Sequence, residues 1–147
     1  MTINRREGNR MNYTFEKLRD IIECFDPCMD NYLYVYDMKQ LRIQIALDDF
    51  GTGYSNLMNI SNLEPDIVKL DRGFTLKALS RSYEYQLMQY VIEMVHKLNQ
   101  YVCVEGVETK EDLEKIKALG PDLIQGYYYS KPCSRDEFLK KFFDYSE

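Results

Sequence analysis

The chain has no tryptophan, a single histidine and no long apolar run among its 147 residues. No stretch approaches the roughly 18–20 apolar residues that a membrane-spanning helix needs. The basic residues 1–10 are not followed by an apolar segment, so they do not resemble a secretory signal, and we expect a cytoplasmic location. Only seven glycines and four prolines are present, which excludes collagen-like and low-complexity classes.

Metal-binding motifs of the zinc-finger type are also lacking. The four cysteines (Cys24, Cys28, Cys103 and Cys133) form no CxxC pair, and the only histidine, His96, is far from Cys24 and Cys28 in the sequence. A structural zinc site needs about four such ligands at short spacing. We therefore expect free thiols, which suits the cytoplasm.

Positive charge is in deficit, since 19 Lys and Arg against 24 Asp and Glu leave a net charge of −5. This balance argues against a protein that coats nucleic acid, because that function usually needs a basic surface. An apolar share of 45% is enough for a packed core, so the chain is expected to form one domain or part of a larger one.

The N-terminal part differs in pattern from the rest. Residues 1–12 are polar and are expected to be a flexible leader. Residues 14–24 have apolar side chains at helical spacing, and the Tyr-rich residues 32–36 favour a strand. We treat residues 13–38 as a short capping segment, separate from residues 39–147.

From residue 43 onward, strand and helix patterns alternate. The expected strands are residues 43–47, 66–70, 101–105 and 122–125. The expected helices are residues 55–63 (begun at Ser55), residues 83–98, a helix capped by Thr109, and a helix after the Ser134–Glu137 capping box. Alternating strands and helices predict an α/β fold with a parallel sheet. Four βα units make about half of an eightfold barrel, and a small open sheet is the alternative.

Polar side chains are concentrated at the predicted strand ends, where parallel α/β sheets carry their functional groups. The residues concerned are Asp48, Asp49, Asp66, Lys69, Asp71, Glu105, Glu108 and Gln125. Adjacent aspartates suit a hard cation such as Mg²⁺ or Mn²⁺, and a bend at Gly51 and Gly53 would help both to ligate it. A lysine and a glutamate nearby can position and deprotonate a water. Together these groups suit phosphodiester hydrolysis.

Each feature also has a purely structural interpretation. Asp48 and Asp49 before Gly-Thr-Gly can be a turn that caps the next helix. Lys69 can extend its amine to the rim from an apolar strand, and Glu105 and Glu108 can cap a helix N-terminus.

Four motifs taken together resemble the second half of the EAL-domain family. They are ALDDFGTGYSNL (46–57), DIVKLDR (66–72), VEGVET (104–109) and QGYYYSKP (125–132). The family hydrolyses the bacterial second messenger cyclic di-GMP to linear pGpG, has a modified TIM-barrel fold and uses Mg²⁺ or Mn²⁺. The resemblance covers about residues 39–144.

The resemblance implies roles for individual residues. Asp48 and Asp49 match the aspartate pair of the metal centre, Lys69 matches the lysine that orients the hydrolytic water, and Glu105 matches the catalytic-site glutamate. Gln125 matches the glutamine of the last rim motif, and Asp71 and Glu108 lie within matched motifs. Gly51, Thr52 and Gly53 match a loop that couples the metal site to dimerisation.

The chain also departs from the family pattern. The Glu-Ala-Leu signature is missing, as are an Asn and a further Glu that ligate metal in the family's first half. Residues 13–37 show some similarity to the start of a PAS sensor domain. We therefore expect a truncated EAL protein whose hydrolysis is absent or strongly impaired, with metal bound weakly or not at all. The alternative is a non-catalytic module that binds cyclic di-GMP or a protein.

The expected partners follow from an incomplete barrel. Two unpaired strand edges and an uncovered inner face favour association, either between copies of the chain or with another protein. Neither a nucleic-acid polymer nor a membrane is expected as a partner.

Overall fold

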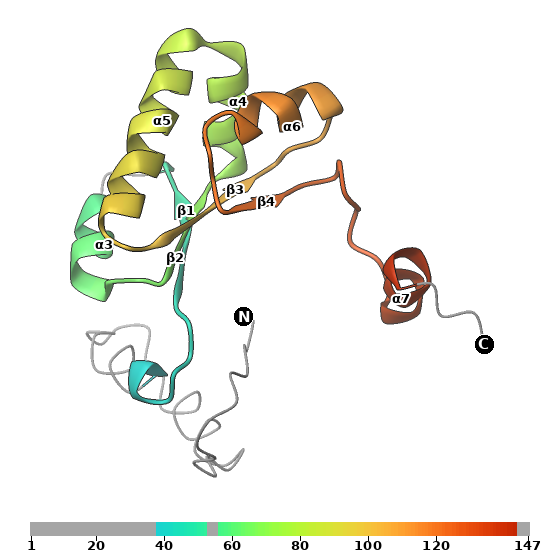
Figure 1. The fold of residues 1–147 in the computed structure, drawn as a ribbon, viewed down its shortest axis with the longest axis horizontal. Coiled ribbons are helices and arrows are strands. Elements are labelled where there is room, and N and C mark those ends of the chain that lie inside the picture. The colour runs from blue at the N-terminus through green and yellow to red at the C-terminus, as the bar shows by residue number, and fades with distance from the viewer. Residues whose placement is uncertain (1–37, 53–55, 144–147) are drawn as a thin grey trace.

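The computed structural model describes residues 38–52 and 56–143 (Figure 1). The expected leader, the helix over 14–24 and the strand over 32–36 lie outside these residues, as do Gly53 and the N-cap Ser55. The elements are β1 (Ala46–Phe50), α3 (Asn56–Leu63), β2 (Ile67–Leu70), α4 (Arg72–Ser80), α5 (Ser82–Lys97), β3 (Tyr101–Glu105), α6 (Lys110–Lys117), β4 (Leu123–Gln125) and α7 (Arg135–Phe142).

The four strands form one parallel sheet in the order β1-β2-β3-β4. Each neighbouring pair is joined through at least one helix, as parallel connections require. The α/β class and the succession of four βα units are therefore as the sequence predicts. Within the described residues, β1 and β4 each have one neighbouring strand, so the sheet is an open one.

One face of the sheet carries the core. Figure 1 shows α4, α5 and α6 on the same side of the strands. Side chains that alternate along the strands point to this side and meet apolar residues of the helices. The buried cluster includes Val68, Leu70, Val102, Val104, Ala78, Met88, Ile92, Val95, Leu113 and Ile116. Burial of these side chains gives the dominant stabilisation of the sheet.

The first strand lies three residues later than predicted. The prediction was residues 43–47, whereas β1 spans Ala46–Phe50. Aspartate is disfavoured in strands, so the pattern placed Asp48 and Asp49 beyond the strand end. Pairing with β2 overrides this preference, since Ala46 and Leu47 lie opposite Ile67 and Val68.

Helix α4 was not predicted, because only one helix was expected between the second and third strands. Its sequence contains Gly73 and the β-branched Thr75, which weaken a helix signal. Tertiary contacts compensate, since Thr75 and Ala78 are buried. The start signal is local: the Asp71 carboxylate accepts a hydrogen bond from the Gly73 amide at 2.7 Å.

The two predicted caps of the later helices are confirmed. Thr109 and Asp112 form a capping box at the start of α6, and Ser134 and Glu137 form one at the start of α7. Helix α7 nevertheless buries none of its residues and lies apart from the sheet in Figure 1. None of the helices in the described part of the chain is both long and apolar enough to cross a membrane.

Candidate functional site

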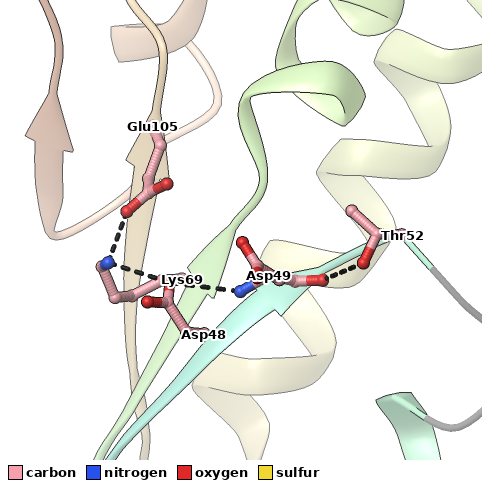
Figure 2. A network of polar contacts seen from close by, with 5 residues as sticks. All are labelled: Asp48, Asp49, Thr52, Lys69 and Glu105. Carbon is pink, nitrogen blue, oxygen red and sulfur yellow. Dashed lines mark hydrogen bonds and ion pairs between the residues drawn. The ribbon is translucent and has the colours of Figure 1, made fainter.

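Lys69 is the centre of a charged cluster at the carboxyl ends of three adjacent strands (Figure 2). Its Nζ lies 2.5 Å from Glu105 Oε1 on β3 and 2.9 Å from Asp48 Oδ1 on β1. The side chains of Lys69 and Glu105 are 23% and 17% exposed, whereas Asp48 is more open. Asp48, Lys69 and Glu105 therefore lie together at one rim of the sheet, as the sequence predicts.

Strand register explains why these side chains share a face. Lys69 lies opposite Cys103, and Glu105 lies opposite Gln125. Leu70 and Val104, which adjoin Lys69 and Glu105 in the sequence, are buried on the helix-covered face. Since side chains alternate along a strand, Lys69, Glu105 and Gln125 point to the opposite face. Gln125 is exposed there.

The electrostatics make Lys69 a permanent cation. Partial burial acts to lower the pKa of Lys69, but its hydrogen bonds to Glu105 and Asp48 outweigh burial and raise the pKa well above the usual value. The same hydrogen bond from Lys69 holds the pKa of Asp48 below its ordinary range. Lys69 can thus bind or orient an anion or a polarised water, but it is poorly suited to act as a base.

The two aspartates lie within the strand rather than after it, and the chain bends between them. Asp49 has φ +55°, which is unusual for a residue other than glycine. Its amide donates to Asp48 Oδ1 at 3.1 Å, and its carbonyl accepts from Thr52 Oγ1 at 2.9 Å. The bend therefore begins at Asp49 and interrupts the regular pairing between Leu47 and Phe50.

The loop after β1 is formed with the help of Gly51. Its φ of +107° belongs to the region that favours glycine, and a Cβ there would lie 3.1 Å from Phe74. Thr52 closes the turn by donating from its amide and its hydroxyl to Asp49. Gly53, the third predicted loop residue, is outside the described residues.

Other predicted site residues are placed differently. Asp71 caps α4 and so has a structural partner. Glu108 accepts from Arg72 rather than pointing to Lys69. Asp66 was expected at the rim, but it precedes β2 at the opposite end of the sheet, where its carboxylate accepts from the Ile45 amide at 2.7 Å. That expectation for Asp66 is wrong, because a strand begins rather than ends beside it.

The described residues do not by themselves fit a divalent metal. In this part of the chain, no group of three or more His, Cys, Asp or Glu side chains is arranged to hold an ion. Two of the carboxylates at the rim, those of Asp48 and Glu105, already bind Lys69. Mg²⁺ and Mn²⁺ prefer six oxygen ligands, so further donors would be needed.

Two recesses border the strand ends. One of about 530 Å³ lies beside the loop after β4 and is lined by Tyr127–Cys133 together with Glu137 and Lys141. Another of about 660 Å³ lies at the opposite, amino end of the strands, against Pro65, Asp66 and Tyr101. The first recess is on the rim side, and its lining begins two residues after Gln125, at Tyr127.

The family model that describes the EAL domain matches residues 26–132. The chain belongs to the EAL-domain family. This match covers most of the chain and includes all four rim motifs. It begins at residue 26, so part of the segment that the sequence analysis set apart aligns with the EAL domain. The division at residue 38 and the PAS-like similarity stay predictions.

Individual proteins that the chain resembles agree with this assignment. The chain is 34% identical over 108 residues to cyclic di-GMP phosphodiesterase NbdA of Pseudomonas aeruginosa. The aligned region covers 71% of the chain and 14% of NbdA. An EAL-domain protein from Listeria monocytogenes superposes with a TM-score of 0.71 at 33% identity, covering 75% of the chain and 44% of that structure. The EAL enzyme Bd1971 in its cAMP- and cyclic-di-GMP-bound form gives a TM-score of 0.71 at 32% identity, with coverages of 75% and 29%. The chain thus spans less than half of each of these three proteins.

The sequence analysis missed two polar pairs. Arg72, the first residue of α4, binds Glu108 across the next loop. The sequence shows no evident partner for His96, whereas in the structure its Nε2 lies 2.9 Å from Asp122 Oδ2. Both pairs join residues at least 26 positions apart, and no local spacing rule predicts such contacts.

Proposed function

We propose that this chain supplies the Lys69, Asp48 and Glu105 part of a cyclic di-GMP site, and that its 147 residues alone hydrolyse the ligand slowly or not at all. The observation that carries the proposal is the placement of Lys69 between two carboxylates at adjacent strand ends in an EAL domain. A fixed cation at this position suits a phosphodiester, whose charge is negative. A cytoplasmic location goes with this proposal.

The chemical roles are divided among these residues. Lys69 would bind a phosphate oxygen or orient the attacking water, since it stays protonated. Glu105 is the carboxylate closest to Lys69 and is the candidate to accept a proton from that water. Gln125, opposite Glu105 in the register, would donate to the ligand from the next strand.

A divalent metal would be held by Asp48 and Asp49 with ligands from outside the described residues. When bound, Mg²⁺ or Mn²⁺ would polarise the phosphodiester and its attacking water. Because the described residues do not complete such a site, we derive no hydrolytic step through the metal. The proposal of slow or absent hydrolysis rests on this incomplete ligand set.

We further propose that the chain associates through its sheet edges. The face opposite the helices exposes Tyr101 at 53% and Leu123 at 48%, and each edge strand in the described part has a single neighbour. A second copy turned about an axis parallel to the strands would bring its β1 beside β4 and keep every strand parallel. Such an assembly, or a protein partner, is the non-catalytic alternative to a nucleotide site.

The association is tested by sedimentation equilibrium of the full chain against its 17.5 kDa monomer mass. Leu123→Lys should shift the distribution toward monomer, because it places a charge on the uncovered face. Tyr83→Lys is the matched control, since Tyr83 is 74% exposed on the helix side. A wild-type chain that stays monomeric at high micromolar concentration would refute the edge association.

The nucleotide site is tested by calorimetry with cyclic di-GMP in the presence and absence of Mg²⁺. Lys69→Ala should abolish the heat of binding, and Lys115→Ala, which removes an exposed lysine on α6, should not. Equal binding by the wild type and Lys69→Ala would contradict the proposal. Binding by neither would favour the protein-interaction alternative.

A further inference from the structure

The turns after β2, β3 and β4 pack against one another with almost no free space. A Cβ on Gly106, which has φ +82°, would lie 2.3 Å from Arg72 Cγ. A Cβ on Gly126 would lie 1.9 Å from the carbonyl oxygen of Val107. Val107 also donates its amide to the Gln125 carbonyl at 3.3 Å and accepts from Tyr128 at 3.1 Å. The loop that follows Glu105 is therefore held between the other two turns.

Arg72 connects two of these turns through a hydrogen-bonded ion pair. Its Nε and Nη2 donate to the same carboxylate oxygen, Glu108 Oε1, at 3.1 and 2.7 Å. The aliphatic part of Arg72 covers Gly106, so its side chain touches the loop at two points. Arginine suits this arrangement because its fork of donors is rigid and always charged.

Two ion pairs join the same two segments of chain. Lys69 binds Glu105 on the face of the sheet opposite the helices. Three residues further along each of the two segments, Arg72 binds Glu108. An anionic ligand that draws Lys69 toward itself would weaken the Lys69–Glu105 contact. The Arg72–Glu108 pair would then hold the loop while Lys69 is occupied.

We propose that Arg72 is a positioning residue, which keeps the loop of residues 106–108 and hence Glu105 in place beside Lys69. This inference rests on the proposed function only in so far as the ligand is cyclic di-GMP. Arg72 itself does not contact the Lys69 cluster in the described structure, and its side chain is 56% exposed. The loop is held by Arg72 independently of any ligand.

The experiment compares amide hydrogen exchange and cyclic di-GMP affinity for the full chain carrying Arg72→Ala or Arg72→Lys. Arg81→Ala is the matched control, because Arg81 forms an exposed pair with Glu84 at 3.1 Å beyond the other end of α4. Arg72→Ala should increase exchange at Gly106 and Val107 and weaken cyclic di-GMP binding about two- to fivefold, the range expected for an exposed ion pair. Arg72→Lys, which keeps the charge but not the fork, should give intermediate values, and Arg81→Ala should change neither.

The outcomes separate the inference from the proposed function. Unchanged exchange in Arg72→Ala would overturn the positioning role whether or not the ligand binds. Faster exchange with unchanged affinity would also overturn it, because the loop would then not serve the site. If the wild type binds no cyclic di-GMP, the proposed function fails, and the exchange measurement alone decides whether Arg72 holds the loop. Circular dichroism of each variant verifies that the fold is retained.

Discussion

Single residues at the rim bind one another and, in the proposed site, would also present groups to a ligand. Lys69 is the clearest case, because its two carboxylate partners come from two different strands. Removing it would leave Asp48 and the largely buried Glu105 without their shared counter-charge. A residue of this kind is expected to affect both stability and binding.

We predict that Lys69→Met lowers the free energy of unfolding by about 1–3 kcal/mol, the range for leaving a partly buried charged group unpaired. Urea unfolding followed by circular dichroism measures the change. Lys115→Ala, which breaks an exposed pair within α6, should cost only about 0.2–0.5 kcal/mol. Equal losses in the two variants would show that the Lys69 cluster stabilises the fold no more than an exposed ion pair does.

Gly126 is required for a different reason, which is close contact with the backbone of Val107. We predict that Gly126→Ala destabilises the protein by more than about 2 kcal/mol, because the contact is with main-chain atoms that cannot rotate away. Gly120→Ala should cost about 1 kcal/mol, since Gly120 has φ +73° but no atom near its missing Cβ. Thermal unfolding of both variants gives the order, and a larger loss at Gly120 would contradict the contact argument.

At the scale of helices and strands, aspartates fix where strands begin. Asp66 accepts from the Ile45 amide, and Asp122 accepts from the Val102 amide at 2.7 Å and pairs with His96. Burial acts to raise the pKa of Asp122, but the Val102 amide and the His96 ring outweigh it and keep the pKa below its usual value. Asp122 therefore ties the end of α5 to the starts of β3 and β4.

This pair predicts a pH dependence of stability. Because the folded pKa of Asp122 is lower than its unfolded pKa, its stabilisation is present above the unfolded value of about 4 and is lost as the pH falls through the folded pKa. Urea unfolding between pH 6 and pH 3 should show a smaller decrease for Asp122→Asn than for the wild type. Asp136→Asn, at a side chain that is 92% exposed, is the control and should follow the wild type.

Local signals predicted most elements well, and non-local contacts account for the rest. The β3 strand follows from a short run of β-favouring residues, and both capping boxes follow from residues three positions apart that bind each other. The β1 boundary depends on pairing with β2, and α4 depends on buried contacts of Thr75 and Ala78, so neither was predicted correctly. At the rim, parallel topology predicted that Lys69, Glu105 and Asp48 gather, but it did not predict that Asp71 caps a helix or that Glu108 binds Arg72.

At the scale of the whole molecule, the described sheet is four parallel strands with helices on one face. The rim cluster lies at the carboxyl end of the face opposite the helices, and the exposed Tyr101 and Leu123 lie on the same face at the starts of β3 and β4. In a closed barrel, the groups that complete a metal site would come from strands across this face. The division of the site between segments is the physical reason for expecting ligand contacts without efficient catalysis.

The central claim is tested most directly by hydrolysis of cyclic di-GMP by the purified chain with Mg²⁺ and with Mn²⁺, with Lys69→Ala as the control. We predict that folded wild-type protein forms at most a trace of pGpG, less than one product per protein molecule over the assay. Many turnovers by the wild type that are lost in Lys69→Ala would contradict the account, because they would mean that these residues complete a working site on their own.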